Sequence, residues 1–147
     1  MPRKILLISV MLPVLAFLFG CGGSSSDAPL SKKEYLQQVD AICAETLEEE
    51  RSALAAATGS DLPARISKAD QEELFTQEIF PQIESALEEV REIPPPAKDK
   101  AVVDEFIGDW EAGLAAVKKK PAQFARGEAF SRGTQGARIY GLSQCLF

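Results

Sequence analysis

The chain has 147 residues and a formal net charge of −6, and it contains no histidine. Its length suits one domain with a modest hydrophobic core. Without histidine, the chain cannot form a Ser-His-Asp triad, a histidine site for zinc or copper, or a haem site with a histidine axial ligand. We therefore expect no enzyme, no metal and no cofactor, with catalysis by Asp, Glu, Lys or Ser as the remaining alternative.

Residues 1–20 have the pattern of a bacterial signal peptide. Two bases precede the apolar run Ile5–Phe19, which is too short for a comfortable membrane span of about 20 residues. The segment Leu18–Cys21 resembles a lipobox, in which the cysteine thiol is acylated and the cysteine becomes the new N-terminus. Phe19 departs from the small or hydroxylated residue usual there. We predict lipidation of Cys21; the alternatives are an uncleaved membrane anchor and an ordinary secretory signal with a chance cysteine.

Residues 21–30 are predicted to form the lipidated N-terminus and a tether. Glycine and serine dominate Gly22–Asp27, a composition typical of flexible linkers. The reach from Gly22 to Pro29 is roughly 16 Å. We expect a diacylglyceryl-type anchor to hold the protein on the extracytoplasmic face of the cell membrane, with residues 31–147 as a single helical domain.

The domain begins with a predicted helix at about 32–57. Ser31 and Glu34 have the spacing of a capping box, which opens helices, and Gly59 marks the end. Apolar residues recur at three- and four-residue spacing along this stretch, which is typical of a helix with one buried face. This pattern places four charged residues mostly on the outward face: Glu48, Glu49, Glu50 and Arg51.

A second helical stretch is predicted from about Leu62 to Glu92, and a third from about Lys98 to Lys119. Pro81 interrupts the second stretch, because a proline inside a helix lacks one hydrogen-bond donor and collides with the preceding turn. The stretch is therefore expected to kink at Pro81, or to continue as a separate helix with the proline in its first turn. Ile93 and the three prolines after it form a stiff corner before the third helix.

The last helix is predicted to begin at Pro121 and to end near Gly141. Three glycines within it, at positions 127, 133 and 136, each lower the helix propensity by about 1 kcal/mol relative to alanine. The expected fold is all-α: an antiparallel four-helix bundle stapled by one disulfide. A three-helix bundle with an irregular C-terminal tail is the alternative.

The disulfide is predicted between Cys43 and Cys145, the two cysteines that remain after Cys21. Outside the reducing cytoplasm, two thiols allow one intramolecular pairing. The bond would close a loop of about a hundred residues and stabilise the fold by about 4–5 kcal/mol in the chain-entropy model. The alternative is two separate buried thiols. We expect the last helix to depend on this bond for its order.

Charge is unevenly distributed along the mature chain. Residues 27–111 contain 21 acids and 8 bases, whereas residues 112–147 contain one acid and six bases. One interpretation is a basic last helix packed beside acidic neighbours; the other is a basic face for lipid headgroups or another anionic partner. The six bases of this possible anion or partner face are Lys118, Lys119, Lys120, Arg126, Arg132 and Arg138.

Two segments are distinctive: Asp-Ala-Ile-Cys at 40–43 and Tyr-Gly-Leu-x-x-Cys at 140–145. With the lipobox, Pro81 and the proline corner, they resemble a group of small extracytoplasmic helical lipoproteins common in actinobacteria. The resemblance spans essentially the whole mature chain. It implies a helical domain stapled by the two cysteines, and it carries no activity.

The function expected from these patterns is that of a non-enzymatic binding or interaction module in the bacterial cell envelope. Its partner would be an envelope protein or another surface component, and we expect no nucleic acid. The alternative is a carrier or sensor of a small apolar or anionic ligand on the outer face of the membrane.

Overall fold

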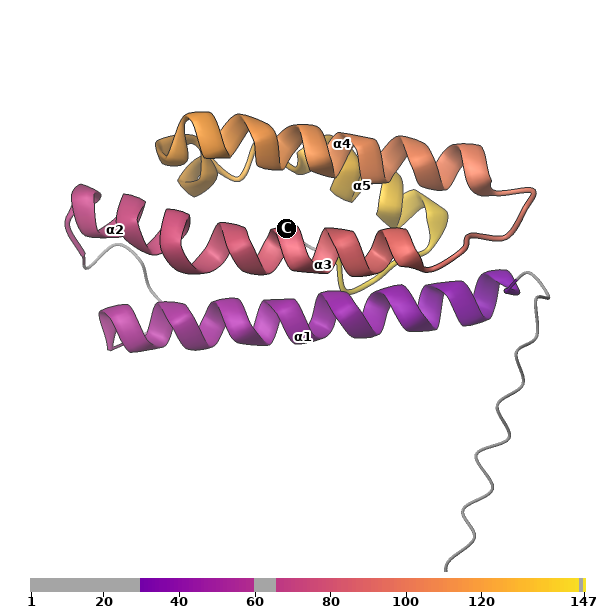
Figure 1. Ribbon diagram of the computed structural model, residues 1–147, viewed down its shortest axis with the longest axis horizontal. Helices are drawn as coiled ribbons and strands as arrows, with labels where there is room; N and C mark the ends of the chain where they lie inside the picture. The colour runs from indigo at the N-terminus through magenta and orange to yellow at the C-terminus, as the bar shows by residue number, and fades with distance from the viewer. Residues whose placement is uncertain (1–29, 60–65, 146) are drawn as a thin grey trace, which may run out of the picture.

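The computed structural model describes residues 30–59, 66–145 and 147 (Figure 1). Over these residues the chain is helical and has no strand, which confirms the all-α prediction. The predicted signal peptide, Cys21 and the predicted tether up to residue 29 lie outside the described residues. The α-helices are α1 (Lys32–Thr58), α2 (Lys68–Leu74), α3 (Phe80–Glu92), α4 (Lys100–Lys119) and α5 (Ser131–Tyr140).

Helix α1 has the ends that the sequence predicts. The backbone N–H of Glu34 donates to Ser31 Oγ at 3.3 Å, and the backbone N–H of Ser31 donates to Glu34 Oε2 at 2.9 Å, which completes the capping box. At the other end Gly59 adopts a φ of +65° and donates its N–H to Ala55 O. A left-handed residue that closes a helix in this way is usually glycine.

The second helical stretch continues through Pro81 by means of a π turn. The turn, η2 (Phe75–Ile79), joins α2 to α3, and the N–H of Phe80 donates to Phe75 O, five residues back. This wider turn lies directly before Pro81, where a regular α-helix would bring the proline ring against a carbonyl group. The stretch begins at Lys68, because the side chain of Ser67 caps it; residues 66 and 67, expected to be helical, are not.

The segment after α4 differs from the prediction of one helix from Pro121. It contains a 3₁₀ helix, η3 (Pro121–Arg126), followed by residues 127–130 and then by α5. Gly127 ends η3 with a φ of +67°, a conformation that interrupts a right-handed helix and that glycine adopts without strain. The expected end of the last helix is confirmed, because α5 stops at Tyr140 and Gly141 follows with a φ of +124°.

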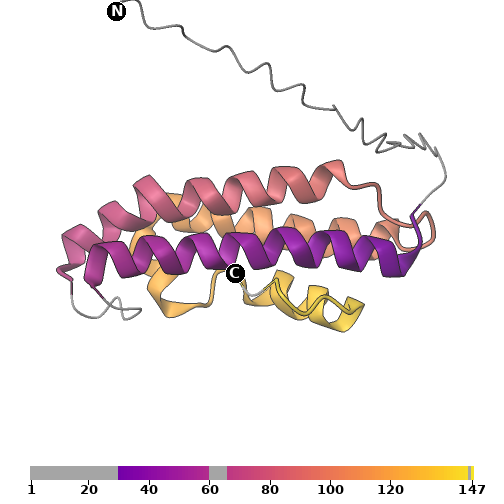
Figure 2. The same cartoon turned by 90° about the horizontal axis from the view of Figure 1, so that it is seen from below.

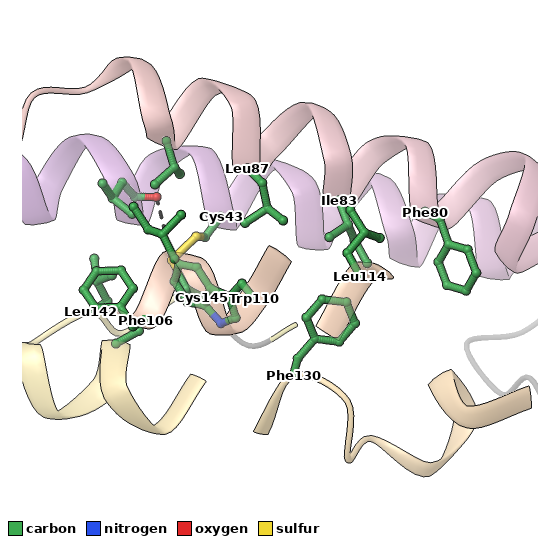
Figure 3. Close-up of a cluster of buried hydrophobic side chains, with 14 of the residues drawn as sticks. Cys43, Phe80, Ile83, Leu87, Phe106, Trp110, Leu114, Phe130, Leu142 and Cys145 are labelled. Atoms are coloured by element: carbon green, nitrogen blue, oxygen red, sulfur yellow. Dashed lines mark hydrogen bonds between the residues drawn. A yellow bond between two sulfur atoms is a disulfide. The ribbon is translucent and has the colours of Figure 1, made fainter. Parts of the chain in front are cut away.

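Helices α1, α3 and α4 lie alongside one another in Figure 1, and Figure 2 shows α3 and α5 on opposite sides of α1. The core between them is rich in aromatic residues, with Trp110 completely buried. Side chains from α1, α3, α4 and the C-terminal segment meet around the disulfide in Figure 3. None of the described helices is long and apolar enough to cross a membrane.

Helix α4 and the segment from Ala129 through α5 approach each other closely at two glycines. A Cβ atom at Gly133 would lie 2.4 Å from Trp110 Cδ1 and 2.9 Å from Phe106 O, and one at Gly113 would lie 2.5 Å from Ala129 O. No larger residue fits at these positions without displacing its neighbours. One of the glycines in the last segment, Gly133, therefore allows α5 to lie directly against α4.

Candidate functional site

The C-terminal segment is fastened to α1 by one covalent bond and a set of hydrogen bonds. Cys43 and Cys145 form the predicted disulfide, with their Cα atoms 4.9 Å apart (Figure 3). One turn earlier in α1, Asp40 Oδ1 accepts the backbone N–H groups of Ser143 at 2.8 Å and Gln144 at 2.9 Å. Asp40 belongs to the distinctive Asp-Ala-Ile-Cys segment, and its role as an acceptor was not anticipated from the sequence.

A groove of about 570 Å³ runs between α3 and α4. Its floor is apolar, because Leu87 from α3 and Leu114 from α4 meet there with the small side chain of Ala115 beside them. Leu87 and Leu114 belong to the core, so the groove exposes an edge of the hydrophobic interior. The rim consists of charged residues from both helices: Glu84, Glu88, Arg91, Glu92, Glu111 and Lys118.

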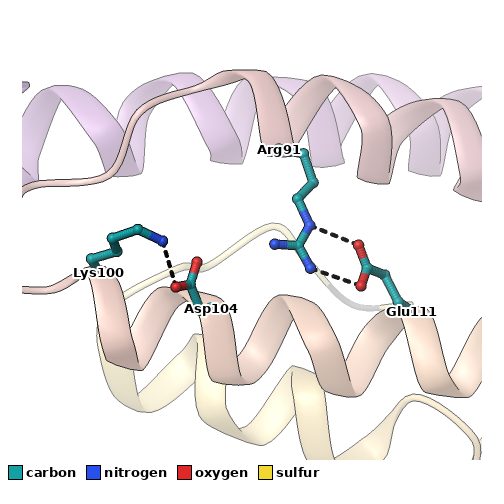
Figure 4. Close-up of polar contacts among 4 residues, drawn as sticks. All are labelled: Arg91, Lys100, Asp104 and Glu111. Carbon is teal, nitrogen blue, oxygen red and sulfur yellow. Dashed lines mark hydrogen bonds and ion pairs between the residues drawn. The ribbon is translucent and has the colours of Figure 1, made fainter.

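Two ion pairs connect α3 to α4 across this groove. Arg91 Nε and Nη2 each donate to a carboxylate oxygen of Glu111 at 2.7 Å, a two-pronged pair that Figure 4 shows. Hydrogen bonding to Glu111 raises the pKa of the Arg91 guanidinium, so this side chain keeps its positive charge across the physiological range. Lys118 Nζ lies 2.5 Å from Glu84 Oε1. These two pairs leave Glu88 and Glu92 as rim acids with no ion pair among the described residues, and the apolar floor lies between the two helices.

The six bases of the predicted basic face do not form one surface of equivalent charges. Lys118 pairs with α3 across the groove, and Arg132 Nη1 lies 3.6 Å from Asp109 Oδ1 on α4. The contact of Arg132 with Asp109 places one base of the last helix beside an acidic neighbour, the kind of contact that the first interpretation of the charge distribution describes. Four bases have exposed side chains and no ion pair within the described part of the chain: Lys119, Lys120, Arg126 and Arg138.

Glu50 is the one member of the acidic run on α1 that turns inward. Its Oε1 atom is buried and has no hydrogen-bond partner among the described residues, and burial raises the pKa of this carboxyl to about 7. On α3, which packs against α1, the Oε1 atom of Gln82 is buried and unpaired in the same way. The expectation of an outward Glu50 was therefore wrong: helical position 50 falls on the buried stripe that includes Cys43 and Thr46.

The groove between α3 and α4 is the candidate binding surface among the described residues. No group of three or more His, Cys, Asp or Glu side chains among them is placed to hold a metal ion. The groove offers an apolar floor for a ligand's apolar groups and paired charges for its polar edges. No protein-family model, curated protein or solved structure matches this chain.

Proposed function

We propose that the mature protein is an envelope lipoprotein, acylated at Cys21 and held on the extracytoplasmic face of the cell membrane. The support is the order of elements in the first 29 residues: bases, a short apolar run, the lipobox-like segment and a glycine- and serine-rich tether. The disulfide fits an oxidising compartment of this kind. The resemblance to small actinobacterial helical lipoproteins points to the same class.

The helical domain acts, in this proposal, as a non-enzymatic binding module. The observation that carries this is the groove between α3 and α4, with its apolar floor at Leu87, Leu114 and Ala115 and two ion pairs across it. Such a surface suits a segment of an envelope protein that presents apolar side chains flanked by polar ones. Arg91 and Glu111 are ideally placed to exchange their mutual hydrogen bonds for bonds to that partner.

We also propose that the domain is an antiparallel four-helix bundle. In this description α1, the continuous stretch α2–η2–α3, and α4 form three members, and the short α5 forms the fourth. The disulfide and the segment after α5 then close the bundle against α1.

The anchor is tested by expressing the full chain in a bacterium that processes lipoproteins and measuring the mass of the N-terminal peptide. We expect a diacylglyceryl modification on Cys21 and recovery of the protein in the membrane fraction. A Cys21→Ala variant should leave that fraction. A mature protein with an unmodified Cys21 would contradict the proposal.

The binding module is tested by in-cell crosslinking and affinity capture of the lipidated protein, followed by mass spectrometry. Ala115→Arg places a large charge in the groove, whereas Ala116→Arg, one residue along the same exposed stretch of α4, is the matched control. We expect a reproducible partner that is lost with Ala115→Arg and kept with Ala116→Arg. If a partner is captured equally well with both variants, the groove is not its binding site. Turnover of a substrate in an unbiased hydrolase or transferase screen would contradict a non-enzymatic role.

A second candidate function is the binding of a small apolar or anionic ligand. The volume of about 570 Å³ is favourable for it, because small-molecule sites commonly measure about 300–1,000 Å³. Gently purified protein should then release a co-purified compound in a denaturing mass spectrum, and the Ala115→Arg protein should release much less. The absence of any compound from the unmodified protein would leave the protein partner as the ligand.

A further inference from the structure

Two large apolar side chains stand out on the described surface. Val102 on α4 is 49% exposed and Ile139 on α5 is 80% exposed, and they are the large hydrophobic residues exposed to this degree among the described residues. Both line a shallow hollow of about 320 Å³ whose apolar part includes Phe106 and Gly136. They therefore form one apolar patch at the contact of α4 and α5.

This patch lies at the end of the molecule where α1 begins. Tyr140, the neighbour of Ile139, donates its hydroxyl to Asp99 Oδ2 at 3.0 Å, just before α4, and Lys32 Nζ lies 4.0 Å from the centre of its ring. Figures 1 and 2 show the start of α1, the start of α4 and the end of α5 at this same end. The residues that precede position 30 therefore join the domain beside the patch.

The position of this junction limits which surface can touch a membrane. Helix α1 has 27 residues, so its far end lies about 40 Å away at 1.5 Å per residue. The predicted tether from Gly22 to Pro29 reaches roughly 16 Å. An anchor at Cys21 therefore keeps the beginning of α1 near the headgroups.

Three lysines at this end can contact an anionic surface. Lys32, Lys33 and Lys98 have exposed side chains here. Several nearby acids are already engaged: Glu34 in the capping box, Asp99 by Tyr140, and Asp104 by Lys100 at 2.6 Å (Figure 4). Three further acids lie in this region: Glu105, which lines the hollow; Asp40, which binds the C-terminal segment; and exposed Glu92 at the end of α3. The opposite end has exposed acids at 48–49 and 72–73 and also exposed bases, among them Lys119, Lys120 and Arg126, so charge alone does not distinguish the two ends.

We infer that this end of the domain rests on the lipid bilayer, with Val102 and Ile139 in the interface and the lysines against anionic headgroups. The inference rests on the proposed lipidation of Cys21 and adds an orientation to it. The end formed by α2 and η3 then points away from the membrane, and the groove between α3 and α4 faces sideways, open to partners in the envelope.

The experiment uses the full-length lipidated protein, reconstituted into vesicles of 70% phosphatidylcholine and 30% phosphatidylglycerol that contain brominated acyl chains. Tryptophan is introduced at Ile139, and at exposed Gln77 at the opposite end as the matched control. Bromine quenches tryptophan fluorescence only at close range, and Trp110 is buried in all variants. We expect the added tryptophan at position 139 to be quenched at least twofold more than the one at position 77.

Charge reversal provides the second measurement. Lys33→Glu with Lys98→Glu should reduce quenching at position 139, whereas Lys119→Glu with Lys120→Glu, at the other end of α4, should leave it unchanged. Equal quenching at positions 139 and 77 in vesicle-bound, acylated protein would overturn the inference alone. Unmodified Cys21 in the mass spectrum would overturn the proposed function and this inference with it. If the tryptophan at position 139 is not quenched by the lipid and becomes shielded from solvent only in a crosslinked protein complex, the patch binds a protein. That result would also overturn the inference.

Discussion

Helix α4 contacts α5 on one side and α3 on another, and the two contacts differ in how closely the backbones approach. On one side, Gly133 of α5 leaves no room for a methyl group against α4, and Gly113 of α4 leaves none against Ala129, just before α5. Against α3, Leu114 and its neighbours form an open groove that the Arg91–Glu111 pair bridges. Glycines thus allow close packing between α4 and the last segment. Between α4 and α3, longer side chains leave an apolar surface that a ligand can reach.

The largest effect should come from the disulfide, which ties the segment after α5 to α1. Replacing Cys43 and Cys145 with serine should lower the free energy of unfolding by about 4 kcal/mol, since the bond closes a loop of about a hundred residues. Urea denaturation measures this loss. Thiol labelling of the unmodified, oxidised protein is the control, and reaction of both cysteines would show that the bond does not form.

Gly133→Ala should disrupt the close packing between α4 and α5. The new Cβ would meet Trp110 and the carbonyl oxygen of Phe106, so we expect a loss of about 2–3 kcal/mol in unfolding free energy. Gly108→Ala is the matched control, because it lies within α4 and its Cβ would meet nothing within 4 Å. It should stabilise the protein by roughly 0.5–1 kcal/mol. Equal effects of the two substitutions would show that α4 and α5 are not closely packed.

Glu50→Gln, on α1, should change how the free energy of unfolding of the protein depends on pH. The folded pKa of Glu50 is about 7 and its ordinary value is 4.5, so between these values the unfolded state is ionised while the folded state keeps its proton. Stability therefore falls as pH rises from about 4.5 to about 7 and stays low above that. The variant should gain roughly 2 kcal/mol at pH 8 and little at pH 4.5. Denaturation at both pH values measures this, with exposed Glu49→Gln as the control; a pH-independent difference would contradict it.

The smallest effect is expected at the open contact. Arg91→Gln removes the two-pronged pair with Glu111, but both side chains are more than two-fifths exposed, and exposed ion pairs contribute about 0.2–1 kcal/mol. We expect a loss of roughly 0.5 kcal/mol in thermal or urea unfolding. In the unmodified protein, high salt should remove a similar amount. A loss of several kcal/mol would mean that this pair, rather than the apolar floor, holds α3 to α4.

Local signals in the sequence were sufficient for much of the fold. The capping box at Ser31 and Glu34, the end of the first helix at Gly59 and the pairing of Cys43 with Cys145 were all predicted. The two helix ends depend on residues a few positions apart. The disulfide depends on there being only two cysteines besides Cys21, which allow one intramolecular pairing. Such features do not require knowledge of how the helices pack.

Features that depend on neighbouring helices were missed. The π turn before Pro81 and the break after Gly127 are backbone adjustments among several that the sequence allows. From the sequence, Gly133 is only a weak helix former. The structure shows that it also lies against Trp110, where no larger residue fits. The groove was also beyond prediction, because periodicity identifies Leu87 and Leu114 as core residues but not which edge of the core remains accessible.

The most direct test of the binding account places a photo-crosslinking amino acid at Ala115, in the groove, of the lipidated protein in living cells. The matched position is Ala56, which is exposed on α1. We predict an adduct of defined mass from position 115 and none of comparable yield from position 56. No adduct at position 115, together with a reproducible one at position 56, would contradict the assignment of the α3–α4 groove as the binding surface.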